Sequence, residues 1–468
     1  MKPINAVLNP QEILASNLDT STPIAGLTQS STAQSLDHLV FFAIKGSKFD
    51  GHDYAGMALA KGASAIVVER PEVYQGLERA ILVKSTRETL ANAASLWFDE
   101  PTKKLKLAGI TGTNGKTTTA YLLKAIWADM GCVSGMVGTV QYHIGPKVFQ
   151  SSLTTPDPLA LQEFFSQMLS AQVTHAAMEV SSIAIDQKRM GGCHFAVGAF
   201  TNLTQDHLDY HQTMENYYLT KRKFFSDYAI PIAVYNVDDE WGLRLHKERL
   251  VGKPLTFSVM QSNADFFAEN CILGRDGTQA TIHTPLGKLE LKTPLVGRHN
   301  VYNCLTALAI VYALNQDLLQ AFESLSHASG APGRLERVSI RKDAPQIFVD
   351  YAHTPDALYN VLTALRGISS PHCGRMITVF GCGGDRDKSK RPQMGRIVSS
   401  MSDITVATSD NPRTEDPQSI INDIEAGIDH EKSTYYRESN RKAAIELALS
   451  IATHEDFVLI AGKGHETY

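Results

Sequence analysis

The sequence predicts an α/β fold in three domains: a small N-terminal α/β domain (residues 1–100), a central domain built on a parallel sheet (101–332) and a C-terminal Rossmann-like domain (333–468). Three observations support this prediction. The chain has 468 residues, enough for about three domains of roughly 150 residues each. Apolar runs of strand length alternate with helical patterns, which is typical of parallel sheets covered by helices. Several runs end in polar clusters, where ligands bind in such sheets.

The first 100 residues contain short apolar runs and one clear helical stretch. The helical pattern covers residues 54–61, and a charged, proline-containing turn follows at 99–101. The runs with the length and composition of strands are residues 39–44, 65–68 and 80–83. We therefore expect a separate small α/β domain that ends at this turn.

A glycine-rich turn opens the central domain. Residues 109–118 read Gly-Ile-Thr-Gly-Thr-Asn-Gly-Lys-Thr-Thr, between an apolar run at 105–110 and a helical stretch at 118–130. Glycines let the backbone aim N–H groups at phosphate oxygens, and the following helix adds the positive end of its dipole. Lys116 would reach the β- and γ-phosphates, and the Thr117 hydroxyl would hold Mg²⁺. The central domain is therefore predicted to be a P-loop-type ATPase domain.

The turn departs from the strict Walker pattern, because position 110 is Ile where that pattern has glycine. The alternative is an ordinary loop that happens to read Gly-Lys-Thr. The strand before the turn and the helix after it favour nucleotide binding.

Two further central strands end in polar residues. The run at 174–178 leads into Glu179, and the run at 195–200 leads into a segment that contains His207. Parallel strands place their carboxyl ends at one edge of the sheet, where the glycine-rich turn also lies. Glu179 and His207 are therefore expected near the nucleotide, although a single histidine in a polar loop is more often structural.

The C-terminal region repeats the same arrangement four times. Its apolar runs at 347–349, 376–380, 404–408 and 457–460 each lead into a polar segment. This predicts a second doubly wound sheet. The glycines at 381–384 do not have the spacing of the dinucleotide fingerprint, which argues against NAD.

Composition narrows the partners and the compartment. The net charge of −5 offers no basic field for nucleic acid. The six cysteines form no Cys-x-x-Cys pair and are expected to be reduced and mostly buried. No apolar stretch approaches membrane-spanning length, and the N-terminus lacks a signal-peptide pattern. We expect a cytosolic protein, a monomer, with no membrane or nucleic-acid partner.

Seven ordered motifs resemble those of the Mur ligase family, the ATP-dependent amino-acid ligases of peptidoglycan precursor synthesis. They lie at residues 109–118, 154–157, 179–182, 202–209, 297–303, 350–356 and 410–413. The resemblance implies a reaction with ATP and Mg²⁺ in which the γ-carboxylate of D-Glu in UDP-N-acetylmuramoyl-L-Ala-D-Glu becomes an acyl phosphate. The amine of meso-diaminopimelate would then displace the phosphate.

The resemblance also implies the residues that handle ATP and metal. The catalytic positions are Lys116, Glu179, His207 and Lys221; the metal positions are Thr117, Glu179 and His207; and Lys221 matches a lysine carbamylated to N6-carboxylysine. The ATP positions are Gly112, Thr113, Asn114, Gly115, Lys116, Thr117, Thr118, Asn300, Asn303, Arg334 and Asp350. Without the resemblance, Lys221 would be read as a solvated helix lysine and Asn300 as a helix N-cap.

Two substrate sites follow in the same way. Matches to the UDP-substrate site are Ser30, Ser47, Lys48, Phe49, Thr154, Thr155, Ser181, Gln187 and Arg189. The sequence departs from many relatives at two places, with Gln29-Ser30-Ser31 in place of Asp-Ser-Arg and Ile183 in place of histidine.

Matches to the diaminopimelate site are Arg386, Asp410, Asn411, Pro412, Arg413, Gly462 and Glu466. Arg413 can hold the distal carboxylate with two hydrogen bonds, and Asp410 and Asn411 can accept from the distal amine. A plain β-turn is the alternative for residues 410–413. The charged run at 385–391 is expected to be a solvated loop in which only Arg386 binds substrate.

Three alternatives remain at the level of the sequence. The chain could add L-lysine instead of diaminopimelate, or it could be a folylpolyglutamate-type synthetase. It could also be a P-loop switch protein that hydrolyses ATP to drive a conformational change.

Overall fold

The computed structural model describes residues 1–46, 49–338, 344–368 and 374–464. Its contacts divide the chain into two units. The first contains residues 1–116, 127–235 and 240–255, and the second contains 117–126, 236–239 and 256–468. No helix among the described residues is long and apolar enough to cross a membrane.

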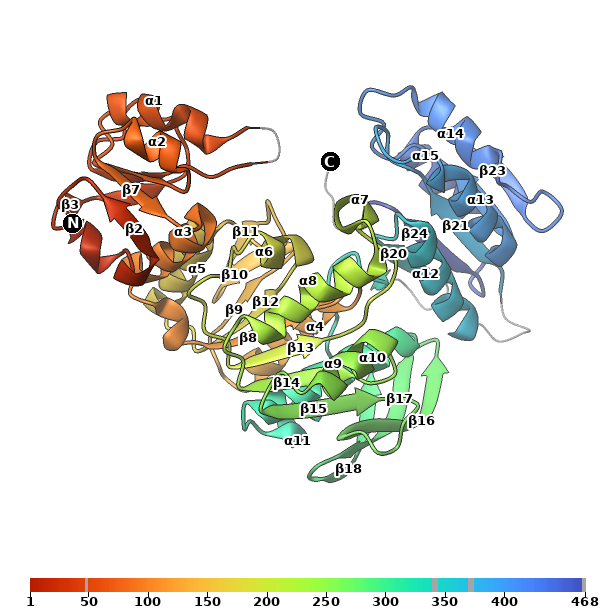
Figure 1. Ribbon diagram of the computed structural model, residues 1–468. Helices are drawn as coiled ribbons and strands as arrows, with labels where there is room; N and C mark the ends of the chain where they lie inside the picture. The colour runs from red at the N-terminus through yellow and green to blue at the C-terminus, as the bar shows by residue number, and fades with distance from the viewer. Residues whose placement is uncertain (47–48, 339–343, 369–373, 465–468) are drawn as a thin grey trace. The chain divides into compact units, whose positions relative to one another are not determined.

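The N-terminal part of the first unit is a five-stranded sheet in the order β2-β7-β6-β5-β4 (Figure 1). Side chains of successive residues point to opposite faces: Phe41 packs with the core under α1 and α2, and Phe42 packs with the core that includes Leu90 of α3. The strands predicted at 65–68 and 80–83 are confirmed with those bounds. The elements are β1 (Lys2–Pro3), β2 (Ile13–Ser16), β3 (Pro23–Ile24), β4 (Gly26–Thr28), β5 (Leu39–Phe42), β6 (Ala65–Val68), β7 (Ala80–Val83), α1 (Ala55–Ala60), α2 (Pro71–Gln75) and α3 (Thr86–Trp97).

The central sheet of the first unit has the order β11-β10-β9-β12-β8-β13-β14. Its core is lined by aromatic side chains from α8, among them Phe224 and Phe225, and by Phe165 from α5. The elements are β8 (Lys106–Thr111), β9 (Ser134–Val137), β10 (Gln141–Ile144), β11 (Lys147–Gln150), β12 (His175–Glu179), β13 (Val197–Phe200), β14 (Ile232–Asn236), α4 (Lys116–Asp129), α5 (Pro158–Ser170), α6 (Ser182–Asp186), α7 (Leu208–His211), α8 (Met214–Ser226) and α9 (Glu240–Glu248).

The second unit contains a β-meander with two helices. β16 pairs in parallel with β15, whereas β16, β17 and β18 are antiparallel to one another. α10 contacts β16, and α11 contacts β18. The elements are β15 (Lys253–Ser258), β16 (Phe266–Gly274), β17 (Gly277–Thr284), β18 (Gly287–Thr293), α10 (Arg298–Ala313) and α11 (Leu318–Leu325).

The expectation of a parallel central sheet is confirmed for the strands beside the glycine-rich turn, and antiparallel strands extend it at its margins. β8, β9, β12, β13 and β14 are parallel, but β10 and β11 are antiparallel. Two residues join β10 to β11, and two join β17 to β18. Such a short connection permits only an antiparallel hairpin, because a parallel neighbour needs a long crossover.

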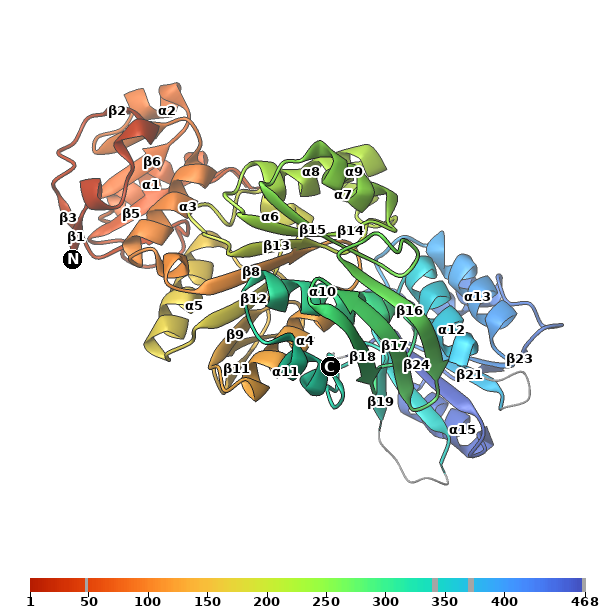
Figure 2. The same ribbon diagram turned by 90° about the horizontal axis from the view of Figure 1, so that it is seen from below.

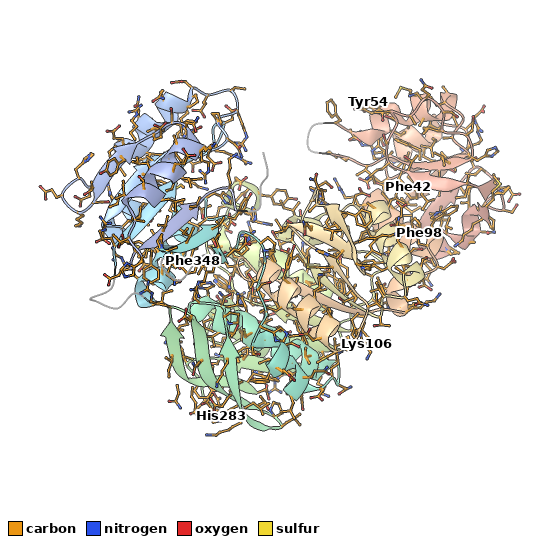
Figure 3. All side chains as sticks on the ribbon, turned by 180° about the vertical axis from the view of Figure 1, so that it is seen from behind. Phe42, Tyr54, Phe98, Lys106, His283 and Phe348 are labelled. Carbon is orange, nitrogen blue, oxygen red and sulfur yellow. The ribbon has the colours of Figure 1, made fainter. Side chains whose placement is uncertain are left out.

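The C-terminal sheet has the order β19-β20-β24-β21-β22-β23, with only β19 antiparallel to its neighbour. α12, α13 and α14 bury side chains on one face and α15 on the other, as Figure 2 shows for α12, α13 and α15. Figure 3 labels Phe42 and Phe348, which are buried in the N-terminal and C-terminal cores. The elements are β19 (Glu336–Val338), β20 (Gln346–Asp350), β21 (Met376–Phe380), β22 (Ile404–Ala407), β23 (Thr434–Arg437), β24 (Phe457–Ala461), α12 (Pro355–Ile368), α13 (Lys390–Met401), α14 (Pro417–Glu425) and α15 (Arg441–Ile451).

Candidate functional site

The glycine-rich turn connects the end of β8 to the start of α4, as the sequence predicts. Gly112 and Gly115 have φ angles of +146° and +89°, which favour glycine because it has no Cβ. Lys116 is the first residue of α4, and its Nζ donates to the carbonyl oxygens of Gly112 and Thr113, each at 2.9 Å. The lysine ammonium therefore lies over the turn, where phosphate oxygens would bind.

The residues after β13 hold this turn in place. The Thr113 N–H donates to the Asn202 carbonyl at 2.9 Å, and the Asn114 N–H donates to the Asn202 side-chain oxygen at 2.9 Å. The Thr201 hydroxyl donates to the Asn114 carbonyl at 2.6 Å. These bonds fix the turn without using the N–H groups of Gly112 or Gly115.

Gly112→Ala tests this arrangement. A Cβ at position 112 would lie 1.9 Å from the Thr201 hydroxyl oxygen, in a backbone conformation that alanine rarely adopts. We expect a loss of about 2 kcal/mol or more in the free energy of unfolding, together with loss of nucleotide binding. Denaturant unfolding and nucleotide titration measure the two effects. Gly56→Ala is the matched control, because a Cβ there meets nothing within 4 Å; a Gly112→Ala protein as stable as this control would contradict the prediction.

Glu179 is the last residue of β12, and its carboxylate is buried. Its Oε1 accepts from the Thr139 N–H at 2.7 Å and its Oε2 from the Thr139 hydroxyl at 3.0 Å. A Cβ on Gly138 would lie 2.4 Å from Oε1, so glycine allows this close approach. The Thr139 hydroxyl also lies 3.1 Å from the Thr154 hydroxyl, which links the carboxylate to a predicted substrate residue.

Lys221 lies on α8 and is buried, which excludes the reading as a solvated helix lysine. Its Nζ donates to the Gly112 carbonyl at 2.9 Å, contacts the Thr111 hydroxyl at 3.4 Å and lies 4.9 Å from the centre of the Tyr217 ring. Burial lowers the pKa of Lys221 well below its ordinary value, and the charge of Lys116 acts in the same direction. The amine is thereby biased towards its neutral form, which is the form that reacts with CO₂.

His207 lies at the start of α7 with a φ of +53°, and its side chain is half exposed. Its Nε2 is 3.6 Å from Asp206 Oδ2. Burial lowers the pKa of His207, the charge of Asp206 opposes this shift, and the charge of Lys116 adds to it. A neutral imidazole is the form that can ligate a metal.

His211 is a residue of this region that the sequence analysis missed. It is buried, stacks on Tyr217 with ring centres 4.8 Å apart, and its Nε2 lies 2.8 Å from the Ser182 hydroxyl. Its position four residues after His207 is the signal that could have identified it. His211 packs against Tyr217, the ring over which the Lys221 amine lies.

The predicted UDP-substrate residues of the central sheet form one connected group. The Thr155 hydroxyl donates to the Glu179 carbonyl at 2.8 Å and accepts from the Ser181 N–H at 3.1 Å. Arg189 Nη1 donates to the Thr155 carbonyl at 2.8 Å, and Arg189 Nη2 donates to Gln187 Oε1 at 2.8 Å. The Ser181 hydroxyl caps α6 by accepting from the Ala184 N–H. Glu179 and Arg189 are therefore joined through Thr155.

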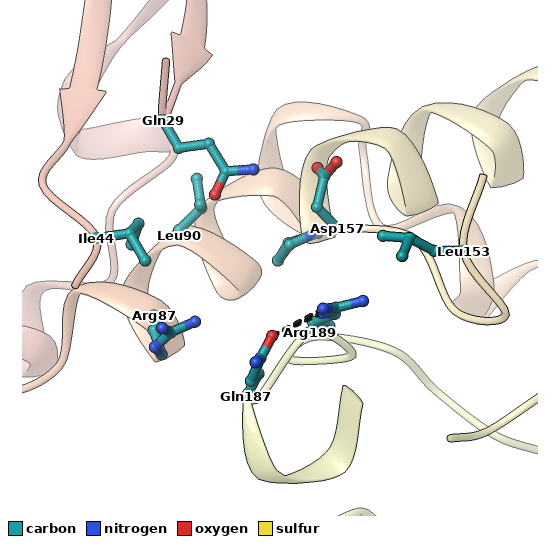
Figure 4. A pocket seen from close by; sticks show the side chains of 9 residues that line it. Gln29, Ile44, Arg87, Leu90, Leu153, Asp157, Gln187 and Arg189 are labelled. Carbon is teal, nitrogen blue, oxygen red and sulfur yellow. Dashed lines mark hydrogen bonds between the residues drawn. The ribbon is translucent and has the colours of Figure 1, made fainter. Parts of the chain in front are cut away.

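Gln187 and Arg189 line a pocket of about 140 Å³ that also receives side chains from the segments after β4 and β5 and from α3 (Figure 4). The remaining lining residues, which the sequence analysis did not assign, are Gln29, Ile44, Arg87, Leu90, Leu153, Asp157 and Pro158. Gln29 belongs to the segment 29–31, in which the sequence departs from many relatives. That departure is the feature of the sequence that could have identified Gln29 as a pocket residue. Arg87 and Arg189 give the pocket two cations against the one carboxylate of Asp157, and this net positive charge suits an anionic substrate.

The other N-terminal predictions have different outcomes. Ser30 follows the pocket residue Gln29 and is exposed, with its hydroxyl 2.8 Å from that of Thr32. Phe49 is exposed. Ser47 and Lys48 lie outside the described residues.

The predicted ATP residues of the second unit form hydrogen bonds within that unit. Asn300 and Asn303 are buried on α10, where the Asn300 side-chain amide donates to the Val296 carbonyl and the Asn303 amide donates to Asn300 Oδ1, each at 2.9 Å. The N-cap of α10 is Gly297, so the alternative reading of Asn300 as the cap is wrong.

Asp350 accepts from the N–H groups of Leu335 at 2.6 Å and Ala352 at 2.7 Å. Burial raises the pKa of Asp350, against the opposing charge of Arg334. Arg334 lies over the Tyr351 ring at 4.9 Å from its centre. Asp350, the last residue of β20, thus binds the chain directly before β19 and directly after β20.

The predicted diaminopimelate residues gather where β21, β22 and β24 end. Arg413 Nη1 donates to the Gly384 carbonyl at 2.8 Å, and a Cβ on Gly462 would lie 2.8 Å from Asp410 Oδ2. Asp410 Oδ1 is buried and has no hydrogen-bond partner among the described residues. An acceptor in this state suits a ligand amine. Glu466 lies outside the described residues.

The charged run at 385–391 is not the fully solvated loop that the sequence suggests. Arg386 is exposed, but Arg391 is buried and binds the carboxylates of Glu415 and Asp423. A buried guanidinium requires such partners, and both come from residues distant in the sequence.

Comparison with known proteins identifies the class of protein. Family models described as Mur ligase family, catalytic domain, Mur ligase middle domain, and Mur ligase, glutamate ligase domain match residues 25–98, 110–311 and 333–464. The chain belongs to the Mur ligase family, and it is an ATP-dependent ligase that forms an amide bond.

Individual relatives narrow this assignment. A UDP-N-acetylmuramoyl-L-alanyl-D-glutamate–2,6-diaminopimelate ligase from Bacillus licheniformis is 43% identical over 437 residues, which are 92% of this chain and 87% of the relative. A solved structure of a ligase with the same name is 31% identical, with a TM-score of 0.76 over 100% of this chain and 95% of that one. The fold also matches a MurF ligase from Thermotoga maritima solved in complex with ADP, at 20% identity, a TM-score of 0.60 and 93% coverage of each chain.

Proposed function

We propose that this enzyme uses ATP to join meso-diaminopimelate to the γ-carboxylate of D-Glu in UDP-N-acetylmuramoyl-L-Ala-D-Glu, with release of ADP and phosphate. One observation carries the proposal beyond the similarity to relatives. The Gly112 carbonyl binds Lys221, which contacts Thr111, and the Thr111 hydroxyl donates to the Val180 carbonyl directly after Glu179. Thr155 continues this chain of bonds to Arg189 in the pocket. The glycine-rich turn and the pocket are therefore linked by a continuous series of contacts that passes Glu179, which supports a shared role for them.

The chemistry follows from what a carboxylate needs in order to react with an amine. A carboxylate oxygen attacks the γ-phosphorus of ATP, the bond to the β-phosphate oxygen breaks, and an acyl phosphate and ADP form. The amine then attacks the acyl carbon and loses a proton. The bond between the acyl carbon and the phosphate oxygen breaks, and phosphate leaves with the electrons of that bond. Lys116 offsets the repulsion between the two anions in the first step.

Mg²⁺ suits the chemistry of three of the predicted donors. We assign the Thr117 hydroxyl, the Glu179 carboxylate and the His207 imidazole to the metal, because hard oxygen donors and a neutral imidazole can bind it directly or through water. Mg²⁺ usually binds through few protein groups, and the nucleotide phosphates complete its shell. The ion would neutralise phosphate charge during transfer.

We also assign Lys221 as N6-carboxylysine. The neutral amine attacks CO₂, loses a proton and becomes a carbamate, so a buried amine becomes an anion. This charge would lie beside Gly112 and Tyr217, next to the phosphate-binding turn. The negative charge would stabilise a bound metal cation, and Lys116 would remain as the cation that faces the phosphates.

The remaining positions complete three binding sites. For ATP we propose contacts from residues 112–118 and from Asn300, Asn303, Arg334 and Asp350. For the UDP-substrate we propose Ser30, Ser47, Lys48, Phe49, Thr154, Thr155, Ser181, Gln187 and Arg189. For diaminopimelate we propose Arg386, Asp410, Asn411, Pro412, Arg413, Gly462 and Glu466. We further propose that the enzyme works in the cytosol. We also propose that it is a monomer, and light scattering, which measures the molar mass in solution, would test this.

A release assay tests the function. Phosphate release is measured with ATP, Mg²⁺ and UDP-N-acetylmuramoyl-L-Ala-D-Glu, together with meso-diaminopimelate, L-lysine or no amino acid, and mass spectrometry identifies the amide. We expect rapid turnover only with diaminopimelate. Equal turnover with lysine would contradict the specificity, and steady hydrolysis without amide would indicate a switch protein. In a separate reaction that contains ATP, Mg²⁺, a folate and L-glutamate, formation of a γ-glutamyl folate would indicate a folylpolyglutamate synthetase.

Arg413→Ala tests the amino-acid site. Its guanidinium is the proposed partner of the distal carboxylate, so we expect the KM for diaminopimelate to rise by about 100-fold, with the KM for ATP unchanged. Steady-state kinetics with each substrate varied in turn measures this. Arg396→Ala, a change at an exposed residue of α13, is the control. An effect confined to the KM for ATP would count against the assignment.

A further inference from the structure

Two loops of the C-terminal domain are locked together at the proposed amino-acid site. The first follows β21 and the second follows β22. The Gly384 N–H of the first loop donates to the Asn411 carbonyl of the second at 2.8 Å. A Cβ on Gly384 would lie 1.8 Å from the Pro412 carbonyl oxygen, so the backbones are in direct contact. The position of each loop therefore sets the position of the other.

Side chains reinforce this contact in both directions. Asp385 accepts from the Thr414 hydroxyl at 2.7 Å and from the Thr414 N–H at 3.1 Å. In return, Glu415 Oε1 accepts from the Asp385 N–H at 2.6 Å. Glu415 also begins the polar network that fixes the second loop to the body of the domain.

Arg391 anchors this network from the first turn of α13. Its Nη2 donates to Glu415 Oε1 at 2.7 Å and its Nη1 to Glu415 Oε2 at 3.0 Å, so both carboxylate oxygens are bound. Nη1 also donates to Asp423 Oδ2 at 2.8 Å, and Nη2 lies 3.3 Å from the Gly383 carbonyl. Only 1% of the Arg391 side chain is exposed. One planar guanidinium thus joins both loops to α13 and α14.

We infer that Arg391 and Glu415 are positioning residues that hold Arg413 and Asp410 in register for the distal end of the incoming amino acid. Arg413 itself donates to the Gly384 carbonyl, one residue from the Gly383 carbonyl that Arg391 contacts. Glu415 is two residues beyond Arg413, on the same loop. Neither Arg391 nor Glu415 needs to touch the substrate, because together they fix the backbone from which Arg413 and Asp410 project.

The inference rests on the proposed function and predicts a specific kinetic pattern. Glu415→Gln keeps the shape of the side chain and removes its charge, which weakens the bonds to Arg391. We expect the KM for meso-diaminopimelate to rise about 10-fold, a change of the size seen when supporting residues around a site are lost. The kcat and the KM for ATP should stay within about twofold. The preference for diaminopimelate over L-lysine should fall, because lysine has no distal carboxylate for Arg413 to hold.

Two further variants make the test specific. Arg391→Lys keeps the positive charge but cannot bind both Glu415 oxygens, Asp423 and Gly383 at once, so the same KM should rise. Glu425→Gln is the matched control. Glu425 lies on α14, and its carboxylate is 3.0 Å from the Arg437 guanidinium, which belongs to neither of the two loops. This control should leave all constants unchanged.

The outcomes separate this inference from the proposed function. If the parent enzyme forms no amide with meso-diaminopimelate, the proposed function fails and this inference fails with it. If the parent enzyme forms the amide but Glu415→Gln keeps the parental KM and amino-acid preference, only the inference is overturned. A uniform loss of kcat together with a lower melting temperature would also overturn it, because a merely structural role has that signature.

Discussion

Lys116→Ala should lower kcat by about 1,000-fold or more while leaving the melting temperature within about 2 °C of the parent enzyme. The ammonium lies over the turn, bound to the carbonyls of Gly112 and Thr113, and in the reaction it would stabilise the transferring phosphoryl group. The turn keeps its own anchors to Thr201 and Asn202 when the lysine is removed. Phosphate release and differential scanning calorimetry measure the two effects.

The control for this prediction is Lys247→Ala, which removes an exposed lysine from α9. It should leave both turnover and stability unchanged. Retained turnover in Lys116→Ala would contradict the phosphate role, and collapse of the melting temperature would mean that the lysine is structural.

Lys221→Met should lower turnover by roughly 100-fold and yet make the protein more stable at neutral pH. Methionine has a similar length and no charge, so it fills the buried site without the cost of burying an amine. Turnover should fall because the variant cannot form the proposed carbamate. Loss of activity with a gain in stability separates a functional role from damage to the fold.

The stability effect has a defined pH dependence. The pKa of Lys221 in the folded protein lies well below its ordinary value of 10.5, so the unfolded chain binds more protons between those two values. The free energy of unfolding of the parent protein therefore rises with pH across this window, and the Lys221→Met protein should show a weaker rise. Denaturant unfolding at several pH values, in buffer free of CO₂, measures the difference.

Lys223→Met on the same helix is the matched control, because its side chain is partly exposed and its Nζ lies 3.9 Å from Asp186. Carbon-13 NMR with labelled bicarbonate should show a carbamate in the parent protein and in this control, but not in Lys221→Met. Normal turnover in Lys221→Met would rule out the carbamate as a catalytic group.

The local pattern of the sequence predicts much of the fold. The runs at 65–68, 80–83 and 376–380 are strands with those bounds, because each is a short, mostly apolar segment bounded by polar residues or glycine. The antiparallel pairs β10–β11 and β17–β18 were not predicted. An alternation of strand and helix patterns does not show which neighbouring strands form a hairpin. The local signal for these hairpins is the two-residue connection between β10 and β11 and between β17 and β18.

Sequence motifs point to the residues of the candidate site that are contiguous in the chain. They do not point to the residues that different elements bring together. Lys116, Glu179 and the 410–413 segment stand at strand ends, which is a local property of the chain. Arg87 and Asp157 enter the pocket from different elements, and Arg391 binds Glu415 and Asp423 across 24 and 32 residues. No local pattern reports such distant partners.

Sequence alone indicated the family, through seven ordered motifs that resemble those of Mur ligases. It also located the glycine-rich turn and the polar strand ends, because glycine spacing and strand ends act over a few residues. The tertiary structure alone decided the state of the groups that could carry the reaction. It buried Lys221 beside Gly112, joined Glu179 to Arg189 through Thr155, and turned Arg391 from a solvated charge into an anchor. The physical reason is that burial, pKa and charge pairing depend on neighbours in space, and the chain brings those neighbours together only when it folds.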